Sequence, residues 1–246
     1  MATRLHIGAK DLRGEVTAYA KRFDLLEVRG LEAASAKQGP NDATLRRWRK
    51  GVPPQFEFAV AAGPGLAKLK DSAALEAELA IMLKTATILA ARVLLLPTPS
   101  DVTPSKLWRD RLAKLIDRLP RDANTIVWEP SGLWETEDAA EQAKKWDITV
   151  GVDPARDPMP AGPVAFGRLR AAGATRAFST TALQKVADAI GERRDAYVLF
   201  ETTNALKEGK ILRALVRQAK GGKKGGLGRL IRPKGASISV GDEQEE

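Results

Sequence analysis

Short apolar runs alternate with amphipathic stretches along most of the chain. Eight of the runs have the length of buried β-strands, and most are separated by stretches with the apolar spacing of helices. The runs are Leu5–Gly8, Leu25–Val28, Phe56–Val60, Val93–Leu96, Thr125–Trp128, Ile148–Val152, Val164–Gly167 and Tyr197–Phe200. This alternation is typical of parallel strands with crossover helices, and a closed barrel of the TIM type has eight strands. We therefore predict an α/β fold, a (β/α)8 barrel or close variant, with an open doubly wound sheet as the alternative.

Amphipathic stretches predict helices at seven places. They cover residues 15–22, 42–50, 73–90, 104–119, 135–145, 181–193 and 205–218. Asp42 is expected to be the N-cap of the second helix, and Pro104 to stand in the first turn of the fourth, where no backbone N–H is needed. The segment Asp153–Pro163 contains four prolines and no helical spacing. A loop is therefore predicted in place of the sixth crossover helix.

The last part of the chain has a different composition. Eight Lys and Arg residues and no acidic residue lie between Arg213 and Lys234, whereas four of the final five residues are acidic. Gly221–Gly226 is too polar and too rich in glycine to bury surface that offsets its ordering entropy. We predict a barrel domain over residues 1–219 and a flexible, disordered tail over 220–246. The strong basicity of the chain, whose net charge is +9, is concentrated in this tail.

Composition excludes several kinds of chemistry. The chain has no cysteine and one histidine, His6, so disulfides, thiolate catalysis and zinc sites are excluded. Gly63-Pro64-Gly65 lacks the third glycine of a dinucleotide fingerprint, and no Walker-type sequence is present. The start of the chain lacks the features of a signal peptide, and Lys84 and Arg92 interrupt its most apolar window. We therefore expect a soluble, cytoplasmic protein without a membrane span.

Charged residues directly follow five of the eight predicted strands. The C-terminal ends of the strands form the ligand-binding face of such barrels, and isolated charges are costly to bury. These side chains are therefore expected to meet in a cleft, or else to form ion pairs that only tie strands together. The candidate catalytic residues are Glu27, Glu129, Asp153 and Arg168. Carboxylates can transfer protons or hold Mg²⁺, and an arginine can clamp a phosphate.

A second group of residues is expected to bind the ligand. It consists of Arg29, Trp128, Trp134, Arg170 and Glu201. Trp128 stands beside Glu129 and Trp134 in the loop that follows, so both tryptophans are placed to line a pocket. The remaining tryptophans, which are Trp48, Trp108 and Trp146, are expected to pack in the core.

Several segments together resemble the domain of unknown function (DUF) family 72, also called YecE-like proteins. The similar segments, in the family's order, are Ile7-Gly8, Leu26-Glu27-Val28, Leu45–Trp48, Pro53–Val60, Trp128-Glu129 with Trp134, Val152-Asp153, Arg168-Leu169 and Tyr197–Phe200. The resemblance runs from Leu5 to about Leu215 and implies a β/α barrel with a cleft at its C-terminal face. The four candidate catalytic residues coincide with family positions. Ala61 stands where the family has a lysine, and Arg170 where it has a histidine, so the resemblance does not extend to those side chains.

Two functions from different classes follow. The first is an enzyme or binding protein for a small anionic or phosphorylated ligand in the barrel cleft. The second is a nucleic-acid-associated protein that uses its basic tail, because Lys and Arg on such a segment release counterions from phosphates. Under this second hypothesis Arg29, Arg168 and Arg170 extend the basic surface into the cleft. The alternative for the tail is a solvated segment that maintains solubility.

Overall fold

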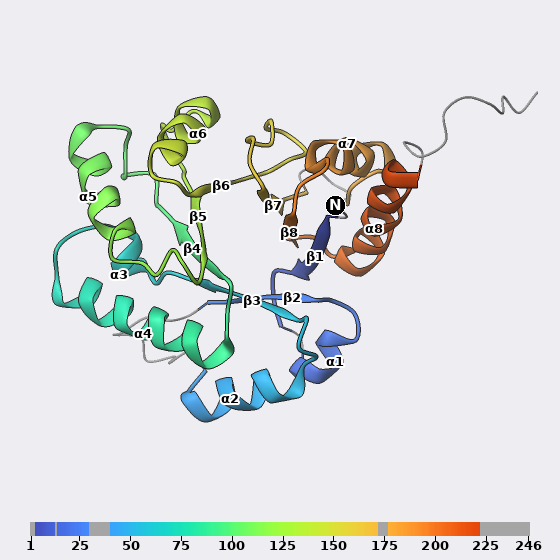
Figure 1. The fold of residues 1–246 in the computed structure, drawn as a ribbon, viewed down its shortest axis with the longest axis horizontal. Helices are drawn as coiled ribbons and strands as arrows, with labels where there is room; N and C mark the ends of the chain where they lie inside the picture. Colours follow the sequence, from blue (N-terminus) through green and yellow to red (C-terminus); the bar gives the residue numbers. More distant parts are fainter. Residues whose placement is uncertain (1–2, 13, 30–39, 172–176, 222–246) are drawn as a thin grey trace, which may run out of the picture.

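The computed structural model describes residues 3–12, 14–29, 40–171 and 177–221, and it shows strands surrounded by helices (Figure 1). The strands are β1 (Arg4–Ala9), β2 (Leu25–Val28), β3 (Glu57–Ala61), β4 (Val93–Pro97), β5 (Thr125–Glu129), β6 (Thr149–Val152), β7 (Val164–Leu169) and β8 (Asp195–Phe200). They pair in parallel in the order β1-β8-β7-β6-β5-β4-β3-β2. The sheet curls into a nearly closed barrel, which confirms the predicted fold class.

Side chains close the junction between β1 and β2, where the described residues form no regular ladder. The backbone N–H of Asp24 donates to the carbonyl oxygen of Ile7 at 3.1 Å, and the Asp24 carboxylate accepts from the N–H of Ile7 at 2.6 Å. The buried Tyr19 hydroxyl accepts from the N–H of Ala9 at 2.8 Å and donates to the carbonyl oxygen of Leu25 at 2.9 Å. One hydroxyl thus satisfies a backbone group on each strand.

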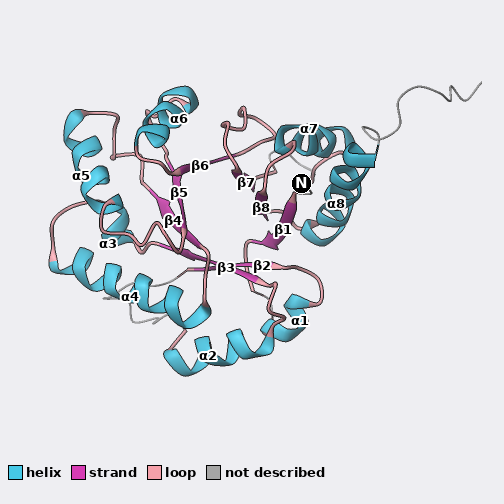
Figure 2. Ribbon diagram, in the orientation of Figure 1, coloured by secondary structure: helices cyan, strands magenta, loops and turns pink. Residues whose placement is uncertain are grey.

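Helices cover the outside of the barrel (Figure 2). They are α1 (Val16–Ala20), α2 (Asp42–Gly51), α3 (Pro64–Ala67), α4 (Ala73–Leu89), α5 (Lys106–Ile116), α6 (Thr136–Lys145), α7 (Thr180–Ile190) and α8 (Ala205–Gly221). The prediction of Asp42 as an N-cap was wrong, because the side chain of Asn41 accepts from the N–H of Thr44. Pro104 also lies outside its helix, since α5 begins after an extended Ser105. The one-turn helix α3 was not predicted from the sequence.

The connection from β6 to β7 has no helix. Residues 153–163 form a loop that passes between α6 and α7 (Figure 1), as the four prolines predicted. At the C-terminal end, α8 continues to Gly221 and so includes the first two residues of the expected tail. The rest of that expected tail, residues 222–246, lies outside the described residues. No helix in the described part of the chain is long and apolar enough to cross a membrane.

Two apolar layers form the core. The outer layer fills the space between the barrel and its helices. The inner layer fills the barrel itself and consists of Leu25, Ala59, Ala61, Val93, Leu95, Val127, Val164, Phe166, Tyr197 and Leu199. Side chains along a strand alternate between two faces with a period of two residues. The residue two positions after each inner residue therefore also points into the barrel, which determines the composition of the next layer.

Candidate functional site

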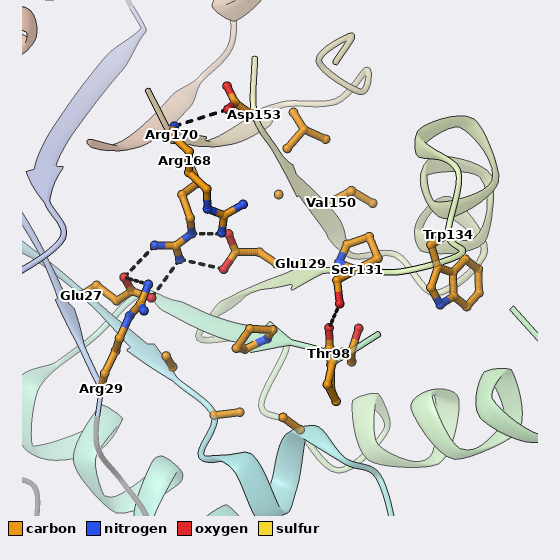
Figure 3. Close-up of a pocket in the computed structure, with 18 of the residues that line it drawn as sticks. Glu27, Arg29, Thr98, Glu129, Ser131, Trp134, Val150, Asp153, Arg168 and Arg170 are labelled. Atoms are coloured by element: carbon orange, nitrogen blue, oxygen red, sulfur yellow. Dashed lines mark hydrogen bonds and ion pairs between the residues drawn. The ribbon is translucent and has the colours of Figure 1, made fainter. Parts of the chain in front are cut away.

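Four charged residues continue the inner rows of their strands toward the C-terminal face. Glu27, Glu129, Arg168 and Glu201 each stand two positions after a residue of the inner apolar layer. Strands β2, β5 and β8 thus bring three carboxylates around one guanidinium, which comes from β7. We refer to these four residues as the Arg168 network (Figure 3, where Glu201 is not labelled).

The guanidinium of Arg168 donates five hydrogen bonds within this network. Nη1 and Nη2 each donate to the Glu27 carboxylate at 2.9 Å. Nε and Nη2 donate to Glu129 at 2.6 and 2.7 Å, and Nη1 donates to Glu201 at 3.1 Å. A guanidinium has five N–H groups. In this arrangement Arg168 therefore has no N–H left for a ligand.

Hydrogen bonds and opposite charges within the network keep Glu27 and Arg168 ionised although both are buried. The side chains of Arg168 and Glu27 are 2% and 1% exposed. Burial alone would raise the pKa of Glu27, but hydrogen bonds and charge from Arg168 and Arg29 outweigh it and hold this pKa below its ordinary value. For Arg168, burial acts to lower the pKa, and the bonds to Glu129 and Glu27 raise it instead. Glu27 is consequently an ionised acceptor near neutral pH and not a proton donor.

Further cations stand above the network at the mouth of the barrel. Arg29 contacts Glu27 at 2.8 Å and Glu201 at 3.4 Å, while Arg170 contacts Glu201 at 3.4 Å. The Arg29 and Arg170 side chains are 45% and 56% exposed, in contrast to Arg168. These two guanidinium groups therefore hold the network from above and also face solvent.

A cleft of about 770 Å³ opens above the network, at the C-terminal ends of the strands. Its walls contain the cations Arg29, Lys68, Arg156 and Arg170, the acids Glu27, Glu129, Asp153 and Asp157, and the hydroxyls of Thr98, Ser131 and Thr136. Ligand pockets have typical volumes of about 300–1,000 Å³. Glu27, Glu129 and Arg168 line this cleft and form its floor, whereas Glu201, which was expected to bind the ligand, does not line it (Figure 3).

Asp153 lies in the cleft wall but outside the network. Its carboxylate accepts from the backbone N–H of Ala155 at 3.1 Å and of Arg170 at 3.3 Å. It also contacts Arg156 at 3.6 Å. Asp153 therefore connects the β6–β7 loop to the residue that follows β7 and positions the backbone of Arg170.

The two tryptophans expected at the pocket occupy different places. Trp134 lines the cleft, and its indole N–H donates to the carbonyl oxygen of Val102 at 2.8 Å. Trp128 is fully buried and does not line the cleft, so its expected place in the pocket is corrected. Its ring packs edge-on against Trp134 and Trp146, and its N–H donates to Thr98. Trp128 faces the helices because its neighbour Glu129 faces the barrel.

The carboxylates are arranged around a guanidinium and not around a metal position. The described residues contain no group of three or more His, Cys, Asp and Glu side chains suited to hold a metal ion. His6 lies deeper, stacked on Tyr197 with ring centroids 5.0 Å apart. Burial lowers the pKa of His6, so this side chain is neutral near pH 7, and it does not line the cleft.

Some cleft residues gave no signal in the sequence. Lys68 follows the short helix α3, and Arg156 lies in the proline-rich loop after β6. Ser131 belongs to the β5–α6 loop, where its hydroxyl donates to the carbonyl oxygen of Thr98 at 2.6 Å. None of these residues directly follows a strand, which was the criterion that selected the other candidates.

Fold and site together define a (β/α)8-barrel protein with a charged cleft at the C-terminal ends of its strands. The model of the family described as "Protein of unknown function DUF72" matches residues 8–229. The chain therefore belongs to the DUF72 family, as its sequence resemblance indicated. A comparison with curated proteins found no match.

Solved structures share the fold at low sequence identity. A DUF72 family protein from Enterococcus faecalis V583 has a TM-score of 0.68 and 14% identity, over 95% of this chain and 100% of the other. A DUF72 family protein from Thermotoga maritima MSB8 has a TM-score of 0.65 and 16% identity, over 85% and 99%. A xylose isomerase domain containing protein from Salmonella typhimurium LT2 has a TM-score of 0.56 and 18% identity, over 89% and 96%. The chain thus shares its fold with this xylose isomerase domain containing protein.

Proposed function

We propose that this protein binds a small anionic molecule, a phosphorylated or carboxylated metabolite, in the cleft at the C-terminal face. The observation that carries the proposal is the contrast between two kinds of arginine in one cleft. Arg168 is buried and its N–H groups are all used, whereas Arg29 and Arg170 are half-exposed above it. Exposed guanidinium groups match the geometry of phosphate and carboxylate oxygens.

In this proposal the Arg168 network is a rigid floor and not the anion clamp. Releasing Arg168 toward a ligand would leave the buried Glu27 with only the half-exposed Arg29 as a partner, which is costly. The anionic group of the ligand is instead held by Arg29 and Arg170, with Lys68 and Arg156 in the same wall. Hydroxyl groups of Thr98, Ser131 and Thr136 supply hydrogen bonds to the polar remainder of the ligand.

In this proposal the four candidate catalytic residues shape the binding site and do not act on a substrate. Glu27, Glu129 and Arg168 hold one another in place as the floor, and Asp153 positions Arg170. Both oxygens of Glu129 accept hydrogen bonds from Arg168, so this carboxylate is engaged in holding the buried guanidinium. The geometry therefore favours binding over proton transfer by this set.

A thermal-shift screen of the full chain tests the proposal. The compounds are inorganic phosphate, glucose 6-phosphate, ribose 5-phosphate, 3-phosphoglycerate and citrate, each beside its uncharged parent where one exists. A ligand at 100 times its Kd adds about 2.7 kcal/mol of stability. We expect stabilisation by at least one anionic compound and not by its uncharged parent.

Matched variants assign that stabilisation to the cleft. Arg29→Gln combined with Arg170→Gln is expected to abolish it, whereas Lys106→Gln, an exposed cation of α5, is expected to retain it. If the double variant responds like the wild type, or if no anionic compound stabilises the protein, the proposal is wrong.

A further inference from the structure

A second pocket lies beside β6, where the sixth crossover helix is absent. The crossover helices of such a barrel form a ring around the strands, but the connection after β6 is a loop that lies between α6 and α7 (Figure 1). The pocket has a volume of about 690 Å³, and its lining comes from the start of β5, from α6, from the start of β6 and from residues 159–164. We call it the β6 pocket. Its volume is within the range of about 300–1,000 Å³ that is typical of ligand pockets.

The β6 pocket enters between the starts of β6 and β7 because the two strands separate there. Their ladder begins at the pair formed by Gly151 and Phe166. The same register would place Thr149 opposite Val164, but these two residues are not paired, and both line the pocket. The opening between the strands therefore belongs to the way the barrel is built at the missing helix.

Much of the pocket lining is apolar. The apolar residues that the argument uses are Ile126, Ala140, Ala143, Ile148, Met159 and Pro160. The two alanines belong to α6, and their small side chains leave space between this helix and the loop. Ile148 and Met159 are only partly buried, so a ligand at this place would cover apolar surface that faces solvent. The thioether of Met159 adapts readily to the shape of an apolar group.

Two opposite charges line the same pocket. Lys144 lies in the last turn of α6, and Asp147 lies two residues after this helix ends. No described residue forms an ion pair with either of these side chains. The other charged lining residues, Glu141 and Arg121, are each in an ion pair with a residue four positions away in the sequence. The pocket thus offers one cation and one anion to a ligand.

Hydrogen-bonding groups without a described partner also line the pocket. Thr125 and Thr149 both contribute to the lining, and neither hydroxyl bonds another group within the described chain. The side-chain amide of Asn124 donates to the carbonyl oxygen of Ala91 at 2.6 Å, so its own oxygen can still accept. These groups can bind the polar end of a ligand while its apolar part lies between α6 and the loop.

We propose that the β6 pocket binds a free α-amino acid with a large apolar side chain. The zwitterion of an amino acid carries one carboxylate and one ammonium group, which complement Lys144 and Asp147. Its apolar side chain occupies the space lined by the alanines of α6 and by Met159. A ligand with a single charge would leave one of the two lining charges without a partner.

This inference goes beyond the ligand of the cleft and does not rest on it. Val150 lines both the cleft and the β6 pocket, but their charged residues are different. The anionic panel tests the cleft, and the amino acids described below test the β6 pocket. Failure of one binding activity therefore leaves the evidence for the other unchanged.

Isothermal titration calorimetry of the full chain with L-phenylalanine, L-leucine and L-methionine tests the inference. We expect at least one of these amino acids to bind. Two derivatives of the tightest ligand each lack one charge, since its N-acetyl form has no ammonium group and its amide has no carboxylate. Each derivative should bind at least about tenfold more weakly, the change that corresponds to loss of one charge-assisted hydrogen bond.

Matched variants assign the binding to the two lining charges. Lys144→Gln and Asp147→Asn are each expected to weaken the binding of the amino acid by at least about tenfold. Asp147 has a φ of 54°, and asparagine adopts this left-handed conformation as readily as aspartate. The controls are Lys114→Gln, in the last turn of α5, and Asp122→Asn. Both residues are exposed and do not line the pocket, so these variants should bind like the wild type.

Three results would overturn the inference. The first is that none of the three amino acids binds. The second is that the N-acetyl and amide derivatives bind as tightly as the amino acid itself. The third is that Lys144→Gln and Asp147→Asn retain the affinity of the wild type, because binding would then take place elsewhere on the protein.

Discussion

Arg168 and Glu27, which come from strands β7 and β2, are joined by two hydrogen bonds of 2.9 Å inside the barrel. The residues are 141 positions apart in the sequence, and both side chains are almost completely buried. Closure of the barrel is what brings them together, since β7 and β2 are not neighbours in the sheet. The Arg168–Glu27 pair therefore forms only when the barrel closes, and it is part of the cleft floor.

Removal of the Arg168 guanidinium is expected to destabilise the protein severely. Arg168→Met leaves three carboxylates without their common partner, and breaking a buried ion pair from one side costs about 3–5 kcal/mol. Urea unfolding measures this loss. Adding Glu27→Gln and Glu129→Gln to the same chain should recover part of the stability, because fewer uncompensated charges remain. A triple variant no more stable than Arg168→Met would contradict this account of the network.

The contribution of Glu27 to stability is expected to depend on pH in one direction. Its pKa is lowered in the folded protein, so its contribution is complete above the unfolded value of about 4.3 and disappears as the pH falls through the folded value. The stability difference between wild type and Glu27→Gln should therefore be constant from neutral pH to about pH 5 and shrink at more acidic pH. Urea unfolding across this series measures it. The exposed Glu137→Gln serves as control and should show a small difference throughout; a Glu27→Gln difference that grows on acidification would contradict the assigned charge.

Tyr19→Phe is expected to weaken the junction between β1 and β2. The substitution leaves the N–H of Ala9 and the carbonyl oxygen of Leu25 without the hydroxyl that satisfies them, which costs about 1–3 kcal/mol. Amide exchange should also become faster at Ala9. Tyr197→Phe is the matched control, since the structure describes no hydrogen bond of that hydroxyl, and its effect should stay within about 0.5 kcal/mol. Equal losses from the two substitutions would show that ring packing, and not the hydroxyl, stabilises the junction.

Asp153→Ala is expected to weaken ligand binding without removing a ligand contact. The carboxylate holds the backbone N–H of Arg170 at 3.3 Å, and loss of a hydrogen bond of about 1 kcal/mol corresponds to about fivefold in affinity. Isothermal titration calorimetry with a compound from the anionic panel measures the change. Asp157→Ala, in the same wall of the cleft, should have a smaller effect. An unchanged affinity for Asp153→Ala would show that Asp153 does not position Arg170.

Much of the fold follows from local patterns in the sequence. The eight apolar runs predicted the strands, and the prolines between Asp153 and Pro163 predicted the missing helix, because both signals depend on neighbouring residues. The alternation of side chains along a strand also predicts which way Trp128 points. Once Glu129 is placed inside the barrel, Trp128 must face the helices. The sequence therefore contains the signal that places Trp128 outside the barrel.

Local patterns could not predict which charged side chains are buried in ion pairs and which remain exposed. Nothing local distinguishes Arg168, which has no free N–H, from Arg170, which is half-exposed two residues later. The two arginines differ because the carboxylates at the ends of β2, β5 and β8 meet around Arg168 only when the barrel closes.

A crystal structure of the full chain with the best-binding compound of the anionic panel tests the central claim most directly. The account predicts that the anionic group lies within hydrogen-bond distance of Arg29 and Arg170, while Arg168 keeps its bonds to Glu27 and Glu129. A ligand whose anionic group is bound by Arg168, with Glu27 or Glu129 displaced from the guanidinium, would contradict it.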